Sequence, residues 1–158
     1  MTAHAVCPVV VVRGRSSPTG PVVVGIDDSE QSAAAALAAA GEARRRHTEL
    51  VLLHAWAPPL RAEGGGPVGW KELAEAGQRA GRDLLAQIQA TVAEHEPDVI
   101  VRPRLGDGSA ASELVAASTS AQPVVVGSRG VGALRGLLLG STTHALIHHS
   151  DCPVLVHR

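Results

Sequence analysis

The sequence predicts a doubly wound α/β domain, in which helices cover both faces of a five-stranded parallel sheet. Short valine- and leucine-rich runs alternate along the chain with longer segments of helical character. Continuous apolar runs are typical of strands buried on both faces, and a regular alternation of strand and helix favours a parallel sheet. A chain of 158 residues has room for one such domain with a single core.

The first half of this domain begins with PVVVGID at 21–27, which predicts a strand. The alanine-rich segment 29–46 predicts a helix, because Ser29 is a favourable N-cap and alanine is the strongest helix former. ELVLLHAW at 49–56 predicts the second strand. The prolines and glycines of 57–69 then predict a loop.

A long helix is predicted over 70–96. Apolar residues recur there at spacings of three and four, which places them on one helix face: Leu73, Ala76, Ala80, Leu84, Ile88 and Val92. The remaining elements are strand 98–105, helix 109–120, strand 123–127, helix 141–149 and strand 153–157. Ligands of such sheets bind at the carboxyl ends of the strands, near the switch in strand order.

Composition and charge exclude several classes of function. The 14 basic residues are balanced by 15 acidic ones, so no basic surface for nucleic acid is expected. No apolar run approaches the roughly 18–20 residues of a membrane span, and no signal peptide is recognisable. Two cysteines, Cys7 and Cys152, do not make a disulfide framework. We therefore expect a cytoplasmic protein with reduced thiols.

The segment GSRGVGALRGLLLGST at 127–142 is the strongest candidate for a ligand site. It begins at a strand end and finishes at a helix start, where free N–H groups and the helix dipole favour an anion such as phosphate. Its glycines allow close approach of the backbone, although they could also serve only to shape the connection. The candidate residues for phosphate are the glycines Gly127, Gly130 and Gly140, the hydroxyl residues Ser141 and Thr142 of the first helical turn, and Arg129 and Arg135 as added positive charge.

Asp27 follows the first strand, where a carboxylate can accept hydrogen bonds from a ribose or an adenine amino group. It also fits as a helix-start charge, and the two roles are compatible. GDGSAA at 106–111 is better explained as a turn with Ser109 as N-cap than as a dinucleotide fingerprint. His144 and His148 are four residues apart but lack an obvious third ligand, so no metal site is expected.

Gly127-x-x-Gly130, nine residues, and then Gly140-Ser141 resembles the signature of the ATP-binding branch of the universal stress protein family. The resemblance covers about 21–158 and includes the closing strand CPVLV. It implies a Rossmann-like or flavodoxin-like sheet in the order 3-2-1-4-5 and a homodimer paired through the last strand. It also implies bound ATP, or another adenine nucleotide, with Mg²⁺.

The same resemblance implies roles for single residues. Asp27 resembles the residue that contacts the nucleoside, with Gly25 beside it, and Ala55 resembles a small residue that lines the adenine pocket. The glycine segment resembles the phosphate and ribose cradle, although the family varies at Arg129. No position supplies a clear catalytic base, so we expect a regulatory stress-response protein with slow or no hydrolysis. The alternatives are an ATP hydrolase or self-phosphorylating enzyme acting through Ser141 or another hydroxyl, and an interaction module that binds no nucleotide.

The chain opens with a further valine run, CPVVVVRG at 7–14, which resembles its end, DCPVLVHR. We predict that residues 8–13 form an extra strand on the sheet edge at 153–157, within the chain or exchanged across a dimer. An exposed apolar strand would otherwise be prone to pairing with other chains. Residues 1–20 would then be an extra strand and linker, and 21–158 the nucleotide-binding domain. The alternative is a coincidental hydrophobic tail.

Overall fold

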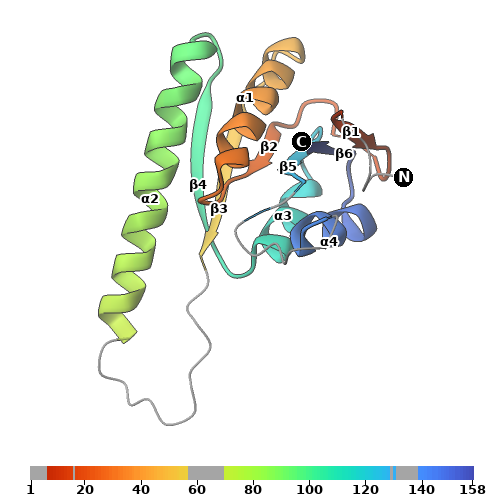
Figure 1. The fold of residues 1–158 in the computed structure, drawn as a ribbon. Coiled ribbons are helices and arrows are strands. Elements are labelled where there is room, and N and C mark those ends of the chain that lie inside the picture. Colours follow the sequence, from red (N-terminus) through yellow and green to blue (C-terminus); the bar gives the residue numbers. More distant parts are fainter. Residues whose placement is uncertain (1–6, 16, 57–69, 129, 131–138) are drawn as a thin grey trace.

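A computed structural model describes residues 7–15, 17–56, 70–128, 130 and 139–158 (Figure 1). It contains a six-stranded sheet in the order β1-β6-β5-β2-β3-β4. The strands are β1 (Val9–Val11), β2 (Val22–Gly25), β3 (Leu50–Trp56), β4 (Val101–Asp107), β5 (Val124–Gly127) and β6 (Val154–His157). The helices are α1 (Glu30–Arg45), α2 (Trp70–His95), α3 (Ala110–Ser118) and α4 (Ser141–His149).

The predicted doubly wound parallel sheet is confirmed. Strands β2 to β6 pair in parallel, and without β1 their order is the one that the family resemblance implied. Helices α1 and α2 cover one face of the sheet, and α3 and α4 cover the other (Figure 1). Each buried strand therefore contributes alternate side chains to two separate cores, which explains the uninterrupted valine and leucine runs.

The core beneath α1 is built from small side chains. Five alanines of this helix are fully buried against the sheet: Ala35, Ala36, Ala39, Ala40 and Ala43. Because alanine has no side chain beyond Cβ, α1 packs close to the valines of β2, and Val22 and Val24 are also fully buried. This close packing gives β2 a fixed position, which matters because its carboxyl end contributes to the candidate site.

Helix α2 corrects one prediction made from periodicity. Ile88 and Val92 are buried as expected, but the first half of the predicted face, Leu73, Ala76 and Ala80, is exposed. The inward side of that half runs through Gly77 and Gly81, where a Cβ would approach Trp56 and His54 of β3 within 2.0 and 2.8 Å. The Trp56 and His54 side chains of β3 fill the space that the glycines leave. The periodicity of apolar residues does not predict this, because glycine is not counted as an apolar position.

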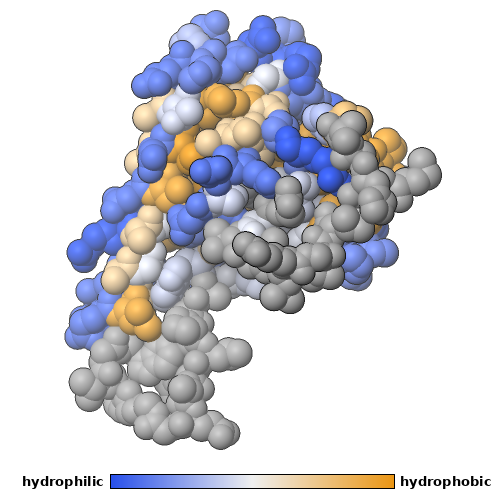
Figure 2. Space-filling model, viewed as in Figure 1, coloured by the Kyte–Doolittle hydropathy of each residue, from blue (hydrophilic) through white to orange (hydrophobic). Residues whose placement is uncertain are grey.

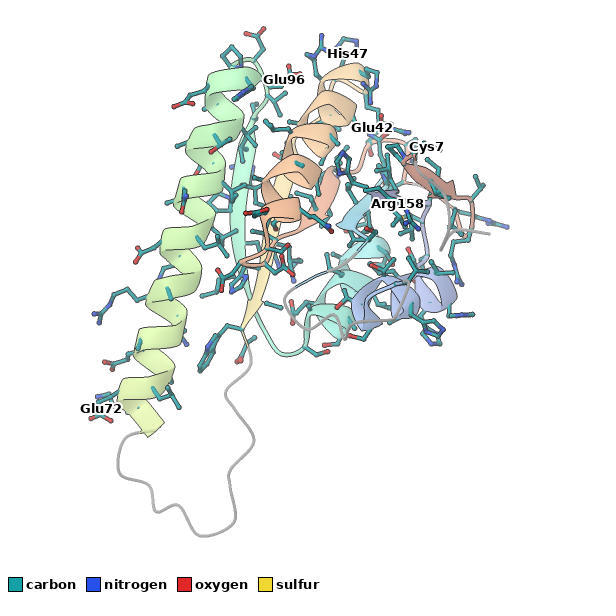
Figure 3. All side chains as sticks on the ribbon, in the orientation of Figure 1. Cys7, Glu42, His47, Glu72, Glu96 and Arg158 are labelled. Carbon is teal, nitrogen blue, oxygen red and sulfur yellow. The ribbon has the colours of Figure 1, made fainter. Side chains whose placement is uncertain are left out.

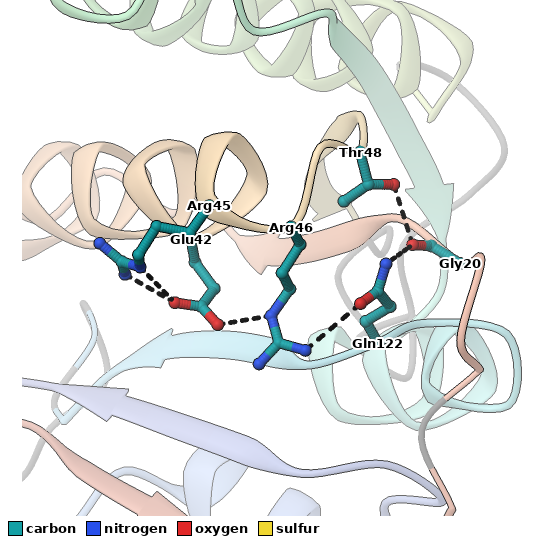
Figure 4. Close-up of polar contacts among 6 residues, drawn as sticks. All are labelled: Gly20, Glu42, Arg45, Arg46, Thr48 and Gln122. Atoms are coloured by element: carbon teal, nitrogen blue, oxygen red, sulfur yellow. Dashed lines mark hydrogen bonds and ion pairs between the residues drawn. The ribbon is translucent and has the colours of Figure 1, made fainter.

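A polar network joins the segments that precede the amino-terminal ends of strands β2 and β5 (Figure 4). Gln122 donates to the carbonyl of Gly20 at 2.8 Å, and Thr48 donates to the same carbonyl at 3.0 Å. Arg46 joins Gln122 to Glu42 of α1. Figure 3 shows His47 and Glu96 at the same end of the molecule, where α1 and α2 finish. Strands β2 and β5 are thus anchored at their amino-terminal ends, opposite to the end where the candidate site lies.

Strand β1 lies antiparallel to β6 in the same chain, as an added edge strand. The prediction of an extra strand at this edge is confirmed, and the pairing here is intramolecular. Gly14, with a φ of +59°, follows the strand and lies so close to the backbone of Asp151 that a Cβ would meet its carbonyl oxygen at 1.9 Å. Apolar surface is visible beside β1 (Figure 2), where Val10 and Val12 are 55% and 83% exposed.

Candidate functional site

A pocket of about 190 Å³ lies between the carboxyl ends of β2 and β5. The chain leaves β2 toward α1 on one face of the sheet and leaves β5 toward α4 on the other. Two neighbouring strands whose connections diverge in this way form the switch point at which open α/β sheets bind ligands. Seven of the predicted site residues line the pocket: Gly25, Asp27, Gly127, Gly130, Gly140, Ser141 and Thr142.

Asp27 lies on the β2 side of the pocket in a defined orientation. Its Oδ1 accepts hydrogen bonds from the backbone N–H and the hydroxyl of Ser29, at 3.1 and 2.5 Å. These contacts form the turn that leads into α1, so the helix-start role expected of Asp27 is confirmed. They also fix the carboxylate plane and direct Oδ2 toward Gly130 of the glycine segment.

Gly130 makes the closest approach across the pocket. A Cβ built on this residue would lie 2.3 Å from Asp27 Oδ2, well inside the contact distance of the two atoms. The absence of a side chain at Gly130 therefore lets the β5 side of the site come up to the carboxylate. This gives a structural reason for glycine at that position, independent of any ligand.

The start of α4 forms the opposite wall. Two hydrogen bonds hold it to the end of β5: Thr143 Oγ1 donates to the Gly127 carbonyl at 3.0 Å, and the Gly140 N–H donates to the Ser128 carbonyl at 3.1 Å. The two ends of the glycine segment are thereby held together. Because the first helical bond runs from His144 to Gly140, the N–H groups of residues 141–143 precede the helical ladder.

Those N–H groups belong to a helix whose N-cap is Gly140, a residue without a side chain that could cap them. The first turn combines N–H groups outside the helical ladder with the positive end of the helix dipole. Ser141 and Thr142 add hydroxyl groups to the same pocket wall. The arrangement is suited to an anion such as phosphate.

The floor of the pocket is aliphatic. Leu53 of β3, Leu114 of α3 and Val126 of β5 line it, and each is at most 4% exposed. Gly25 is packed against this floor, since a Cβ there would lie 2.8 Å from Leu114 Cδ1. One side of the pocket is therefore apolar, while Asp27 and the α4 terminus supply polar groups at its rim.

One predicted residue, Ala55, is not brought into the pocket. Ala55 packs in the core beneath α3 and is not among the lining residues; Leu53, two positions earlier on the same face of β3, lines the pocket instead. Arg129 lies outside the described residues. Sequence reasoning also missed Ser32 and Thr143, buried hydroxyl residues in the first turns of α1 and α4. Their position within one turn of a strand end was the available signal.

The described residues contain no group of three or more histidine, cysteine or acidic side chains that could hold a metal ion. His144 and His148 lie side by side on α4, with ring centroids 4.6 Å apart.

No helix among the described ranges combines the length and apolar character needed to cross a membrane. Burial raises the pKa of the Cys152 thiol, an effect that its hydrogen bonds only partly offset.

Comparison with known proteins identifies the family. The model of the universal stress protein family matches residues 19–158. Universal stress protein Rv2623 of Mycobacterium tuberculosis is 37% identical over 160 residues, which cover 98% of this chain and 52% of that protein. The chain thus spans about half the length of the curated relative.

Solved structures agree on the fold. Universal stress protein UspA from Lactobacillus plantarum superposes with a TM-score of 0.77 at 21% identity, covering 91% of this chain and all of that one. The universal stress protein from Archaeoglobus fulgidus in complex with dAMP superposes with a TM-score of 0.62 at 22% identity, covering 88% and 98%. The family match over residues 19–158 shows that the chain belongs to the universal stress protein family.

Proposed function

We propose that this chain is a regulatory stress-response protein that binds an adenine nucleotide, ATP in the first place, between β2 and β5. The observation that carries the proposal is the pairing of unlike groups across one pocket. An oriented carboxylate, Asp27, lies on one side, and the first turn of α4 lies on the other. A nucleotide offers donors at its base and ribose and negative charge at its phosphates, which matches both sides.

In this arrangement Asp27 accepts a hydrogen bond from the ribose or from the adenine amino group. The aliphatic floor of Leu53, Leu114 and Val126 holds the base, with Gly25 packed against it. Gly127, Gly130, Gly140, Ser141 and Thr142, together with Arg129, receive the phosphates at the α4 terminus. The Archaeoglobus fulgidus protein of the same fold is in complex with dAMP, which supports an adenine nucleotide as the ligand class.

Mg²⁺ would arrive with the nucleotide and be held mainly by phosphate oxygens and water. Magnesium commonly binds in this way, through substrate phosphates and few protein carboxylates. The pocket fits this mode, since Asp27 is the one acidic residue among the described lining residues.

We propose that ATP acts as a ligand and is hydrolysed slowly or not at all. A dedicated hydrolase needs a base within hydrogen-bond reach of the attacking water. Among the described lining residues only Asp27 is titratable, and its Oδ1 is engaged by Ser29. Self-phosphorylation is the alternative, because the hydroxyls of Ser141 and Thr142 lie where the phosphates are placed.

Ligand identification tests the proposal directly. Protein purified under native conditions is denatured, and the released small molecules are identified by mass spectrometry. Titration calorimetry of the emptied protein with ATP, ADP, AMP and GTP then measures affinity. We expect an adenine nucleotide to be released and ATP to bind more tightly than GTP. Absence of binding by all four nucleotides would leave the interaction-module alternative.

Turnover is measured separately. The wild-type chain and Asp27→Ala are incubated with ATP, with and without Mg²⁺, and phosphate release and protein phosphorylation are followed. We expect release to stay near background and no phosphate to remain on the protein. Rapid Mg²⁺-dependent release, or a stable phosphoprotein that Ser141→Ala abolishes, would establish an enzyme instead.

We further propose that the β6 edge is the assembly edge, where β1 takes the place of the closing strand of a second copy. Residues 7–11 and 152–156 share the order Cys-Pro-Val-x-Val, so that Val10 corresponds to Leu155. Val10 pairs with Leu155, and Val9 and Val11 pair with Val156 and Val154. Equivalent residues therefore face one another, as in two identical strands related by a twofold axis.

A homodimer would then form through this edge, by exchange of β1 or by direct pairing of two β6 strands. Residues 1–20 would serve as the added strand and linker, and 21–158 as the nucleotide-binding domain. The cytoplasm is the compartment that the composition favours. No nucleic-acid or membrane partner is proposed.

A further inference from the structure

One peptide unit, between Ile26 and Asp27, is held by two side chains from different elements. The β2 ladder continues one residue beyond Gly25, where the Ile26 N–H donates to the Leu53 carbonyl at 2.9 Å. Beyond that point the backbone leaves the sheet, and its polar groups need other partners. His54 Nδ1 lies 2.9 Å from the Ile26 carbonyl oxygen, and Ser32 Oγ accepts from the Asp27 N–H at 2.8 Å.

The first of these contacts fixes the form of the His54 ring. A carbonyl oxygen can only accept a hydrogen bond, so Nδ1 must carry the proton for the contact to be favourable. The donor comes from β3, two positions before its end, and it points to the α1 and α2 side, away from the pocket floor formed by Leu53.

The His54 ring is in turn positioned by α2. A Cβ on Gly81 would lie 2.8 Å from His54 Cδ2, so the ring fills the space that this glycine leaves. Ser32, the second partner, is only 4% exposed in the first turns of α1. Side chains from α1 and β3 thus bind the peptide that carries Asp27, and α2 packs against the His54 ring.

We propose that His54 and Ser32 are positioning residues for nucleotide binding, which act by clamping the Ile26–Asp27 peptide. The proposal rests on the assignment of Asp27 to the nucleotide. His54 does not line the pocket and contacts no ligand; its effect passes through the peptide. Ser32 holds the N–H of the same peptide, so the two contacts together set both the position and the tilt of the Asp27 Cα.

Paired substitutions at position 54 test the role of the donor. His54→Leu keeps bulk but removes Nδ1–H, whereas His54→Asn places an amide N–H near the original Nδ1. We expect His54→Leu to weaken ATP binding about three- to tenfold, the scale of one hydrogen bond, and His54→Asn to restore most of the affinity. Equal affinities of wild type and His54→Leu, measured by titration calorimetry, would overturn the proposal.

A double-mutant cycle distinguishes positioning from general destabilisation. If His54 acts only through Asp27, His54→Leu should cause little further loss of affinity once Asp27→Ala is present. Additive losses in the double variant would show that His54 acts independently of Asp27. Ser32→Ala should repeat the non-additive pattern, and Ser32→Thr should retain the hydroxyl acceptor. Thermal unfolding of every variant shows whether it is folded at the titration temperature.

A remote variant extends the test to α2. Gly81→Ala does not touch the pocket but places a methyl group against His54 and Leu105. We therefore expect ATP affinity to fall about two- to fivefold, within the range of one hydrogen bond. Gly41→Ala is the matched control, because its methyl group would meet only Arg45 and Glu96 atoms at 3.6 and 3.9 Å. Equal affinities for the two glycine variants would contradict the proposed route through α2.

The tautomer gives a readout that needs no nucleotide. In ¹⁵N-labelled protein, long-range ¹H–¹⁵N correlation spectra at pH 8 should show His54 with the proton on Nδ1. A neutral ring protonated on Nε2 would overturn the clamp whatever the binding data. Absence of ATP binding by the wild-type chain would instead refute the proposed function, and the spectrum would still decide whether the clamp exists.

Discussion

At the scale of the residue, substitution of Gly130 is the most direct test of how the pocket binds ATP. A Cβ at this position would lie 2.3 Å from Asp27 Oδ2, so Gly130→Ala must push the carboxylate out of its orientation. We expect ATP affinity to fall by about tenfold, which corresponds to about 1.4 kcal/mol. Calorimetric titration of the variant measures this loss.

Gly25→Ala is the matched comparison, since Gly25 lines the same pocket. Its new methyl group would meet the end of the Leu114 side chain, which can rotate away more easily than a carboxylate held by Ser29. We expect a smaller loss of affinity than for Gly130→Ala. The reverse order would show that the pocket floor, and not the carboxylate, controls binding.

The same residues show how far the site could be predicted from sequence. Asp27 and the glycines were recognisable because a strand end, a helix start and a spaced motif are all local features. Ser32, Leu53 and Leu114 were not, because they join the pocket only through packing of α1, β3 and α3 around it. His54 carried no signal in the sequence, since its hydrogen bond to Ile26 spans 28 positions.

At the scale of the element, the strands and helices were predictable where one period dominates. Buried strands such as β2 and β5 consist of valine runs, and α1 is an alanine-rich helix that follows Ser29, although the Ser29 side chain forms no capping bond. Helix α2 was predicted in extent but not in orientation. Its Gly77 and Gly81 face the sheet, and Trp56 and His54 of β3 fill the space between the helix and the strand. Glycine is not counted in an apolar pattern, so the pattern could not predict this face.

The corrected face of α2 predicts unequal effects along the helix. Leu85 is 2% exposed and packs in the core, whereas Leu73 is 48% exposed. Leu85→Ala should lower the free energy of unfolding by about 2–5 kcal/mol, as for other large-to-small core changes. Leu73→Ala should change it by less than about 0.5 kcal/mol. Urea unfolding of both variants decides between this face and the one drawn from periodicity.

The carboxyl end of α1 predicts a pH dependence. Burial tends to raise the pKa of Glu42, but hydrogen bonds from Arg45 and Arg46 outweigh it, and the pKa lies below the ordinary value of 4.5. A lowered pKa in the folded state stabilises the fold above the unfolded pKa, and this stabilisation is lost as the pH falls through the folded value. Glu42 contributes through partly exposed ion pairs, so the effect is small.

Glu42→Gln should therefore lower the free energy of unfolding by about 0.5–1 kcal/mol at pH 7. The difference from wild type should shrink as the pH falls below the ordinary value of 4.5 and through the lowered pKa of the folded state. Urea unfolding at pH 7 and pH 3.5 measures both values. A difference that persists unchanged at the lower pH would show that shape or packing, and not charge, makes Glu42 stabilising.

At the scale of the whole molecule, the added strand decides how the sheet ends. Five parallel strands would leave β6 as an open edge beside an apolar core, and open edges pair readily with other chains. β1 covers that edge with a register in which Val10 faces its counterpart Leu155. Because β1 and β6 present equivalent residues to this ladder, a chain that lacks β1 can pair its β6 with the β6 of a second copy.

Deletion of residues 1–19 should therefore shift the chain toward a homodimer paired through two β6 strands. Light scattering after size exclusion should give twice the monomer mass at concentrations where the full chain shows less dimer. Leu155→Lys in the truncated chain places two like charges opposite each other at the centre of that ladder, which is destabilising, and should return it to a monomer. Val12→Ser in the full chain is the control, because Val12 is 83% exposed and lies outside the paired residues. Unchanged mass and unchanged stability after truncation would mean that β1 merely lies on the edge and plays no part in assembly.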